Sequence, residues 1–315
     1  MQIGYLGLGK MGSRMVMKLL SGGHDVVVWN RSPEPISALE KEFSGLPILP
    51  QRGKLIIAPK IDGLVKSLTQ PRIFWSMLTA GQATEAVLTD ISQFLSSGDI
   101  VIDGGNSNFK DTERRYRNFE SKGIRFLGIG VSGGVHAIEN GYPLMAGGDR
   151  SAYEVIKPIL DTLSHPRGGH SYFGAGGSGH FVKMVHNGIE YGMMQAIGEG
   201  FGVMDKSPYS LNLLEVAKLW QKSTIVSGFL VDRAKDALEK NVKLSDAEGA
   251  IAASGEGEWT VQQGKDEGVP VENIEQSLEF RMKSQTDEKI RSSYAARMIN
   301  ALRREFGGHE VKKKD

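Results

Sequence analysis

The residues best suited to proton transfer lie together in one segment, Lys183 to Tyr191, which reads KMVHNGIEY. If this segment is a helix, Lys183, Asn187 and Glu190 stand at i, i+4 and i+7 and share one face, with His186 beside them at i+3. A base, an amide and a carboxyl group then point into the same volume. The alternative interpretation is a solvated helix face, on which Lys183 and Glu190 are too far apart to pair and simply face water. The rest of the chain decides between the two.

Composition limits the classes of protein to consider. A chain of 315 residues and 34.4 kDa is long enough for two domains. A net charge of +1 gives no general attraction to nucleic acid or to a membrane surface, and no apolar run approaches the ~18 residues that span a bilayer. The absence of cysteine excludes disulfides, thiol catalysis and cysteine-ligated metal. We therefore expect a cytoplasmic enzyme without a metal, nucleic-acid or membrane partner.

A glycine-rich turn follows the first predicted strand, Met1 to Leu6, and leads into a helical pattern. In the G-x-G-x-x-G arrangement, Gly7 allows a tight turn, Gly9 lets backbone N–H groups approach a pyrophosphate, and Gly12 permits close helix–strand packing. The helix N-terminus adds N–H donors and a partial positive charge. A merely structural glycine turn is the alternative, but the strand–turn–helix context favours a dinucleotide site. Its expected residues are Gly7, Leu8, Gly9, Lys10, Met11 and Gly12.

The end of the second predicted strand, Asp25 to Trp29, bears on the choice of dinucleotide. NAD sites usually place an acidic residue there for the ribose 2′-hydroxyl. This sequence has Asn30, Arg31 and Ser32 instead, an amide, a guanidinium and a hydroxyl that suit a 2′-phosphate. We predict NADP as the cofactor, with Asn30, Arg31 and Ser32 at the site. In the alternative, Arg31 only stacks on the adenine and NAD also binds.

Alternating strand and helix patterns up to Leu163 predict an α/β fold with a Rossmann-type, doubly wound parallel sheet. No element can be assigned with any precision over residues 44–60. After Ser178 the pattern is helical only, which predicts an all-α C-terminal domain. We place the dinucleotide-binding domain at residues 1–178 and a helical substrate-binding and dimerisation domain at 179–315. The predicted helices of the second domain are His180–Met204, Leu213–Ser223, Gly228–Lys240, Val271–Ser284 and Asp287–Phe306.

Three turns follow predicted strands, where ligands bind in open α/β sheets. The first, Leu78 to Gly81, is expected to contact the cofactor through Leu78 and Gly81. The second holds Asn106 in the sequence DGGNS, and the third holds Ser132, Gly133 and Gly134.

At this point the sequence resembles decarboxylating 6-phosphogluconate dehydrogenase, of the 6-phosphogluconate and β-hydroxyacid dehydrogenase superfamily. The motifs that carry the resemblance run through nearly the whole chain. They are G-L-G-x-M-G, D-G-G-N-S, V-S-G-G, K-M-V-H-N-G-I-E-Y-G-x-M-Q and R-x-x-F-G-x-H. The chain looks like the short form of the family, whose helical domain is about half the size of that in the long form.

The resemblance implies oxidative decarboxylation of 6-phospho-D-gluconate to D-ribulose 5-phosphate and CO₂, with reduction of NADP, in the pentose phosphate pathway. Lys183 would be the general base on the C3 hydroxyl, and Glu190 the acid that protonates C1 of the enediol. Lys183 must then be neutral near pH 7, so its pKa must lie far below the ~10.4 of a free lysine. Burial is the expected cause of that decrease. Desolvation would likewise keep Glu190 partly protonated.

The resemblance also implies a set of substrate-binding residues and an assembly. Tyr191 and Arg281 would contact the phosphate, and the tail residues Arg303 and His309 would enter the site of a neighbouring subunit in a homodimer or dimer of dimers. The remaining residues would hold the sugar hydroxyls and carboxylate or the nicotinamide end of the cofactor. They are Asn106, Ser132, Gly133, Gly134, His186 and Asn187.

Two departures from the family pattern leave alternatives open. Glu258 stands where the family often has a phosphate-contacting cation, so it must point away or the substrate differs. The turn Leu78 to Gly81 lacks the proline that the family tends to have there. A dehydrogenase of a smaller or non-phosphorylated β-hydroxyacid is one alternative, although such enzymes lack the Glu190-Tyr191 pair. A nucleotide-binding sensor without turnover is another, and it would need neither Lys183 nor Glu190.

Overall fold

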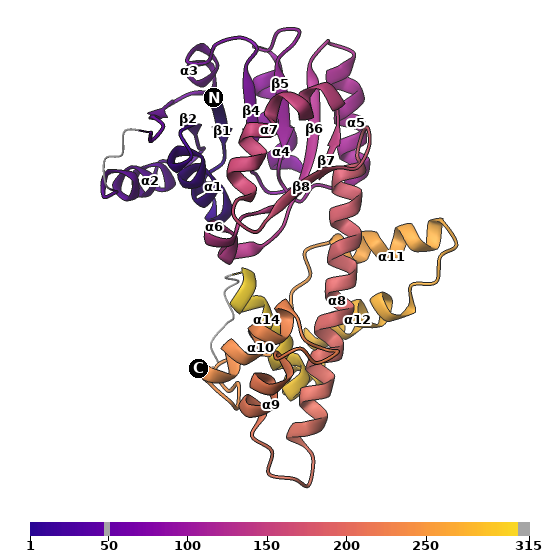
Figure 1. Cartoon of the computed structure of the whole chain (residues 1–315). Coiled ribbons are helices and arrows are strands. Elements are labelled where there is room, and N and C mark those ends of the chain that lie inside the picture. The colour runs from indigo at the N-terminus through magenta and orange to yellow at the C-terminus, as the bar shows by residue number, and fades with distance from the viewer. Residues whose placement is uncertain (47–50, 308–315) are drawn as a thin grey trace. The chain divides into compact units, whose positions relative to one another are not determined.

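The computed structural model describes residues 1–46 and 51–307. The chain divides into two compact units, Met1–Lys183 (unit 1) and Met184–Asp315 (unit 2). The expected domain boundary between residues 178 and 179 stays a prediction. Unit 1 is built on a sheet with helices on both faces, and unit 2 is helical, which confirms the predicted fold class (Figure 1).

The sheet of unit 1 has eight strands in the order β3-β2-β1-β4-β5-β6-β7-β8. The order reverses between β1 and β4, and ligands of open α/β sheets bind beyond the carboxyl ends of strands at such a switch point. The strands are β1 (Gln2–Leu6), β2 (Asp25–Trp29), β3 (Leu55–Ile57), β4 (Ile73–Ser76), β5 (Ile100–Asp103), β6 (Arg125–Val131), β7 (Pro143–Gly148) and β8 (Gly169–Tyr172).

One pair departs from the expected parallel arrangement, since β7 runs antiparallel to β6. The connection between them holds only residues 132–142, with the 3-10 turn η1 (Gly134–His136) and the single-turn helix α6 (Ala137–Asn140). A parallel return needs a longer crossover, usually with a full helix packed on the sheet. Two strands, β3 and β8, were not predicted. The first lies in the irregular region after residue 44, and the second, GHSY, has no apolar alternation.

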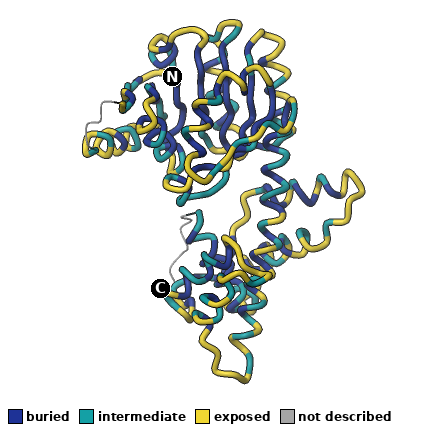
Figure 2. The backbone as a smooth tube through the Cα atoms, in the orientation of Figure 1, coloured by how far each residue is buried: buried dark blue, intermediate teal, exposed yellow. Residues whose placement is uncertain are grey.

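Both faces of the sheet are buried because apolar residues of one strand alternate between two cores. Val26 and Val28 of β2 join one core, which also includes Met15 of α1 and Ile156 of α7. Val27 joins the other, whose helical residues come from α3, α4 and α5. Figure 2 shows the strands in dark blue between more exposed connections. The helices concerned are α1 (Lys10–Ser21), α2 (Glu34–Ser44), α3 (Ile61–Lys66), α4 (Gln82–Ser92), α5 (Phe109–Glu120) and α7 (Arg150–Ser164).

The longest helix, α8 (Ser178–Asp205), begins in unit 1 and continues into unit 2. Two differences from the predicted helices follow it. The helix expected over Asp287–Phe306 is two helices, because Asp287 caps the first and the Ser293 hydroxyl caps the second. A further helix, α11, was not predicted. The helices of unit 2 are α9 (Leu213–Trp220), α10 (Phe229–Lys240), α11 (Glu256–Asp266), α12 (Glu272–Ser284), α13 (Glu288–Arg291) and α14 (Tyr294–Gly307).

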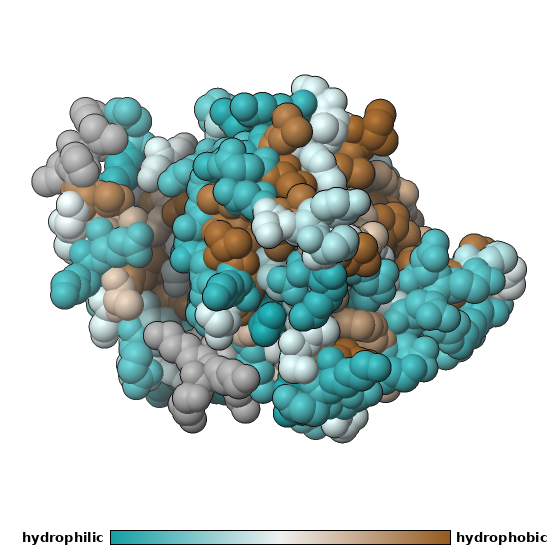
Figure 3. Space-filling model, turned by 90° about the horizontal axis from the view of Figure 1, so that it is seen from below, coloured by the Kyte–Doolittle hydropathy of each residue, from teal (hydrophilic) through white to brown (hydrophobic). Residues whose placement is uncertain are grey.

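Unit 2 has its own apolar core, centred on residues of α8, α10 and α14. It also exposes large apolar side chains, including Ile189, Met193, Leu219, Phe229 and Met282. A space-filling view shows apolar patches set in a hydrophilic surface (Figure 3). Over the described residues, no helix combines the length and apolarity that crossing a bilayer requires.

Candidate active site

The glycine-rich loop has the geometry that its sequence predicts. Gly7 has a φ of +102°, and a Cβ added there would lie 2.5 Å from the carbonyl oxygen of Met77. A Cβ on Gly12 would collide with the carbonyl of Gly7, so helix α1 starts in direct contact with the turn. No atom of the described residues lies within 4 Å of a Cβ built on Gly9. The space over Gly9 is thus available for the close approach of a ligand, as a pyrophosphate requires.

The three residues after β2 divide into two roles. The Asn30 side chain accepts a hydrogen bond from Leu8 N at 2.9 Å and donates one to Ser32 O at 2.8 Å, so it shapes the glycine loop. The side chains of Arg31 and Ser32 are exposed. Within residues 1–46 and 51–307 the Arg31 guanidinium has no hydrogen bond or ion pair, which leaves it available to an anion.

The other predicted turns meet the glycine loop at the carboxyl edge of the sheet. A Cβ on Gly7 would contact Leu78, and one on Gly105 would lie 2.7 Å from the Leu78 carbonyl oxygen. Gly81, the N-cap of α4, and Gly133 both require positive φ, at +91° and +96°.

The turn that contains Ser132, Gly133 and Gly134 is followed by residues bonded to helix α1. Arg14 donates to Val135 O at 3.3 Å, and Lys18 donates to Ile138 O at 3.0 Å. Unit 1 therefore brings together the expected cofactor residues Gly7 and Leu78 and sets the segment after the Ser132 turn beside the cofactor helix.

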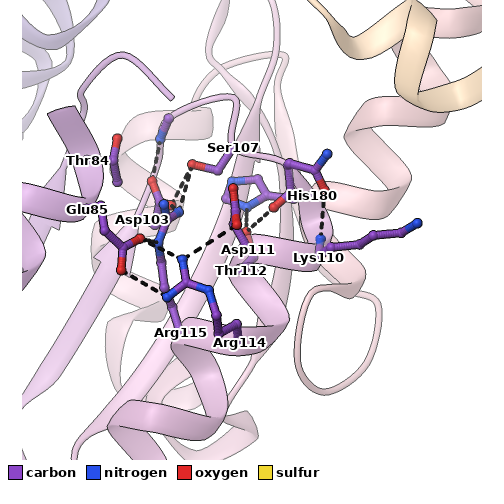
Figure 4. Close-up of polar contacts among 12 residues, drawn as sticks. Thr84, Glu85, Asp103, Ser107, Lys110, Asp111, Thr112, Arg114, Arg115 and His180 are labelled. Carbon is purple, nitrogen blue, oxygen red and sulfur yellow. Dashed lines mark hydrogen bonds and ion pairs between the residues drawn. The ribbon is translucent and has the colours of Figure 1, made fainter. Parts of the chain in front are cut away.

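A buried carboxylate organises the turn that carries Asn106. Asp103, fully buried at the end of β5, accepts hydrogen bonds from Gly105 N at 3.1 Å, Ser107 Oγ at 2.7 Å and Arg115 Nη1 at 2.9 Å (Figure 4). The flanking residues Gly105 and Ser107 are buried, whereas Asn106 is exposed. Asp103 thus folds the turn so that its one exposed side chain is the predicted ligand contact.

The same network extends to the helix after β4. Arg115, 3% exposed, also donates to Glu85 at 3.0 Å, and Glu85 accepts two further bonds from Arg114 (Figure 4). The Arg114 guanidinium, with help from Arg115, lowers the pKa of Glu85 to about 2. We call Asp103, Ser107, Arg115 and Glu85 the Asp103 cluster. Sequence reasoning missed its role. Asp103 could have been found as the first letter of DGGNS, but nothing in the sequence pointed to Arg115 or Glu85.

Lys183 lies on helix α8 directly over the sheet. It is 6% exposed, and a Cβ on Gly130 of β6 would collide with the Lys183 side chain. A glycine on the sheet is therefore what admits the lysine. Burial of an amine disfavours its charged form, which is the direction that a general base needs.

Further along α8, three of the predicted residues are near neighbours in unit 2. His186 Nδ1 lies 3.0 Å from Asn187 Oδ1 and 3.9 Å from Glu190 Oε2. Asn187 is 9% exposed, while the Glu190 and His186 side chains are 23% and 41% exposed. Helix α8 is continuous from residue 178 to 205, so Lys183, Asn187 and Glu190 share the face that the sequence predicts.

Tyr191 and Arg281 form a buried stack in unit 2. The Arg281 guanidinium carbon lies 3.3 Å from the centre of the Tyr191 ring. Arg281 is 2% exposed and Tyr191 is 4% exposed. The Tyr191 hydroxyl accepts from Ser254 N at 3.2 Å. Burial lowers the pKa of Arg281 to about 10, and the charge of Arg303 contributes to the same shift. In the described part of the chain, Arg281 Nη2 is buried without a hydrogen-bond acceptor.

Arg303 joins this group within the same chain. Its Nη1 donates to Asn300 Oδ1 at 3.0 Å, and burial lowers the pKa of Arg303, opposed by Tyr191 and Glu190. The charge of Arg303 thus acts on Arg281 of its own chain, and its expected place in a neighbouring subunit's site stays a prediction. His309 lies outside the described residues. We call Tyr191, Arg281, Arg303 and Glu190 the Arg281 cluster.

The acidic segment at the start of α11 has one buried and one exposed carboxylate. Glu258, the departure from the family pattern, is exposed, whereas Glu256 is 4% exposed at the positive end of the helix. Gly257 between them packs against the Tyr191 ring. No group of three or more possible metal ligands occurs among the residues that the structure describes.

Comparisons with known proteins agree with this geometry. Residues 2–176 match the model for the NAD binding domain of 6-phosphogluconate dehydrogenase, and residues 179–312 match the model for the 6-phosphogluconate dehydrogenase C-terminal domain. The protein is 38% identical to an NAD⁺-dependent, decarboxylating 6-phosphogluconate dehydrogenase of Haloferax volcanii and 37% identical to a putative 6-phosphogluconate dehydrogenase of Bacillus subtilis. Both matches cover 100% of each chain.

A solved structure is similar over most of the chain. It is the 6-phosphogluconate dehydrogenase of Plasmodium falciparum, described apo, with its cofactor NADP⁺ and with its substrate 6-phosphogluconate. The TM-score is 0.83 at 30% identity, and the match covers 92% of the present chain but 63% of the Plasmodium one. The present chain therefore corresponds to the full length of the short relatives and to about two thirds of the long one.

Proposed function

Because the chain belongs to the 6-phosphogluconate dehydrogenase family and is an NAD(P)-dependent oxidoreductase, we propose that it converts 6-phospho-D-gluconate to D-ribulose 5-phosphate and CO₂. The observation that carries this proposal is that α8 is one continuous helix, which includes Lys183, Asn187, Glu190 and Tyr191. The open space over Gly9 supports a dinucleotide on the glycine loop.

Lys183 acts as the base in this proposal. A nicotinamide dinucleotide held on the glycine loop would supply the acceptor for the hydride that leaves C3 of the substrate. Lys183 takes the proton of the C3 hydroxyl, and the 3-keto acid then loses its carboxyl group as CO₂ when the C1–C2 bond breaks. The electron pair of that bond moves toward the C3 oxygen, where the Lys183 ammonium stabilises the enolate by a hydrogen bond. The side chain's burial favours the neutral amine at the start of the cycle.

Glu190 completes the reaction as the acid. It protonates the carbon from which CO₂ has left, which becomes C1 of ribulose 5-phosphate, so the atoms and protons balance. The Glu190 side chain is only 23% exposed and has His186 Nδ1 at 3.9 Å. Asn187 Oδ1, 3.0 Å from the same nitrogen, holds the imidazole beside the Glu190 carboxyl group.

The Arg281 cluster suits the phosphate of the substrate. A buried guanidinium with an unsatisfied N–H and a lowered pKa is unfavourable in the free protein, and a dianionic phosphate would relieve both defects. The added charge of Arg303 strengthens the preference for two negative charges. A non-phosphorylated hydroxyacid would leave the cluster unsatisfied, which disfavours that alternative.

We assign NADP⁺ as the preferred acceptor, with Arg31 as the residue that binds the 2′-phosphate. The exposed guanidinium and the absence of a carboxylate at residues 30–32 support this preference. Arg31→Ala should raise KM for NADP⁺ at least tenfold and change KM for NAD⁺ little. A wild-type protein that prefers NAD⁺, as the Haloferax relative is named to do, would contradict the assignment.

We also propose a homodimer or dimer of dimers formed through unit 2. Ile189 and Met193, both about half exposed, stand four residues apart on α8 and form one apolar helix face. Light scattering after size exclusion tests the oligomer, and Ile189→Glu should dissociate it. A cytoplasmic location stays a prediction of the sequence.

The decisive experiment measures NADPH formation and CO₂ release with 6-phosphogluconate as the substrate. Equal amounts of both products support the reaction. Lys183→Ala should reduce both by at least 10³-fold, as expected for loss of a general base. NADPH without CO₂, or turnover of gluconate as fast as of 6-phosphogluconate, would favour the β-hydroxyacid alternative. Turnover retained in Lys183→Ala would refute the role of the lysine, and a wild type that binds NADPH but turns over no hydroxyacid would favour the sensor.

A further inference from the structure

His180 is a buried histidine in the first turn of α8, three residues before Lys183. It is 1% exposed, and its Nδ1 lies 2.7 Å from the hydroxyl of Thr112 on α5 (Figure 4). Burial lowers the pKa of His180, so the ring is neutral and its charge is not its function. The mechanism above uses neither His180 nor Thr112.

The turn of helix that carries His180 lies directly on the backbone of β6. Residues Phe126, Gly128 and Gly130 point to the same face of the sheet, since they are two apart on one strand. Cβ atoms on Gly128 and Gly130 would collide with Thr112 and Lys183, respectively, and the first would also lie 3.0 Å from His180 Nδ1. The two glycines bring the lysine and the histidine close to the sheet, and the His180–Thr112 bond then fixes the turn laterally.

The same two side chains adjoin the turn that carries Asn106. Thr112 stands on the first turn of α5, and its hydroxyl also donates to Asn108 O at 3.1 Å. Burial has the largest effect on the pKa of His180 and lowers it, whereas the charge of Asp103 and the backbone of Gly105 raise it. Thr112 thus bonds to Asn108, which follows the Asn106 turn, and to His180, which belongs to the same helical turn as Lys183.

We propose that His180 and Thr112 are a positioning pair that sets Lys183 relative to Asn106. This inference rests on the proposed function, in which Lys183 and Asn106 contact the substrate or cofactor. Neither His180 nor Thr112 touches the reacting atoms. Their effect is on the geometry of proton transfer, where a displacement of about 1 Å lowers rates by up to ~10²-fold.

A partly buried histidine of unit 1 provides a control with the same kind of hydroxyl bond. His170 of β8 has its Nδ1 2.9 Å from the hydroxyl of Tyr153 on α7. Neither element carries a predicted site residue. Tyr153→Phe therefore deletes a hydroxyl bonded to a histidine, as Thr112→Val does, but without access to the Lys183 turn.

The test compares Thr112→Val, Thr112→Ser and Tyr153→Phe by kcat, KM, cofactor affinity and Tm. Thr112→Val should lower kcat about tenfold and leave Kd for NADPH within twofold of wild type. Thr112→Ser keeps the hydroxyl and should retain wild-type kcat. Tyr153→Phe should lower Tm only. Thr112→Ala repeats the comparison if Thr112→Val does not fold.

Wild-type kcat in Thr112→Val, with a Tm loss like that of Tyr153→Phe, would show that the pair is merely structural and overturn the inference. A wild type inactive on 6-phosphogluconate would instead refute the proposed function alone. Hydrogen exchange then decides the positioning role. Faster exchange over residues 104–107 and 179–186 in Thr112→Val, but not in Tyr153→Phe, supports it, and unchanged exchange overturns it.

Discussion

The molecule has two clusters of buried charge that differ in how completely they are satisfied. In the Asp103 cluster of unit 1, Asp103 accepts three hydrogen bonds, and Arg115 donates to two carboxylates, those of Asp103 and Glu85. In the Arg281 cluster of unit 2, Arg281 stacks on Tyr191, its pKa is lowered to about 10, and its Nη2 has no hydrogen-bond acceptor among residues 1–46 and 51–307. Asp103, Arg115 and Arg281 are all deeply buried, so burial alone does not separate the two clusters.

The difference indicates what each cluster is for. A buried charge with all its partners in the chain fixes local structure, because removing one partner leaves the other unpaired at low dielectric. A buried cation with a missing partner is unfavourable in the free protein and becomes favourable when an anion arrives. The Asp103 cluster therefore shapes a turn, and the missing partner in the Arg281 cluster supports the proposal that this cluster binds the substrate phosphate. The following predictions test that contrast.

The largest effect on stability is expected for Asp103→Asn. The substitution leaves Arg115 with only the half-exposed Glu85 as an ionic partner, so we expect a loss of about 3 kcal/mol in the free energy of unfolding. Urea denaturation measures it. Asp111→Asn is the control, since that carboxylate is about half exposed and lies 3.5 Å from Arg114, and it should change stability by less than about 1 kcal/mol. Equal losses in the two variants would mean that the Asp103 cluster does not hold the turn.

The opposite outcome is expected for Arg281→Met. KM for 6-phosphogluconate should rise about 100-fold through loss of a charge-assisted contact to phosphate. Stability should stay unchanged or increase, because an unsatisfied buried charge is replaced by an apolar chain of similar length. Kinetics and urea denaturation of the same preparation measure both. Lys283→Met, which removes an exposed cation of the same helix, should leave KM unchanged. A destabilised Arg281→Met with normal KM would make this arginine structural.

The contrast between the clusters also explains how far the sequence alone could lead. The glycine loop and the helix with Lys183 and Glu190 were predictable because each is a local pattern of fixed spacing. The tight turn requires a positive φ at Gly7, and the offset of Lys183 from Glu190 is set by the helix itself. Neither depends on contacts with distant segments of the chain. The fold class followed in the same way from alternating strands and helices.

Contacts between segments distant in sequence were not predictable. Arg115 meets Glu85 across 30 residues and His180 meets Thr112 across 68, and no local spacing encodes either pair. The antiparallel β7 depends on the length of a connection, and β8 lacks an apolar alternation. The effect of Arg303 on the pKa of Arg281 depends on the packing of α14 and α12, which no local motif encodes.

Acid sensitivity provides a smaller test of the Asp103 cluster. The pKa of Glu85 is lowered from 4.5 to about 2, so the carboxylate contributes stability above pH 4.5 that is lost as the pH falls toward 2. Since its side chain is 41% exposed, screening reduces the contribution to about 1 kcal/mol. Glu85→Gln should be less stable than wild type by that amount at pH 7, and the difference should vanish near pH 2. A difference independent of pH would show that Glu85 acts by packing and not by charge.

The smallest effect is expected at the Arg281 cluster, for Glu258→Lys. Glu258 is exposed on α11, beside Gly257, which packs on the Tyr191 ring. A cation there should attract the substrate phosphate and lower KM for 6-phosphogluconate about threefold, as expected for an exposed charge worth under 1 kcal/mol. The effect should disappear at 1 M salt, where the screening length falls to about 3 Å. Glu267→Lys makes the same change of charge at the far end of α11 and controls for net charge. An equal decrease of KM in both variants would indicate long-range steering, and no decrease in Glu258→Lys would place residue 258 beyond reach of the phosphate.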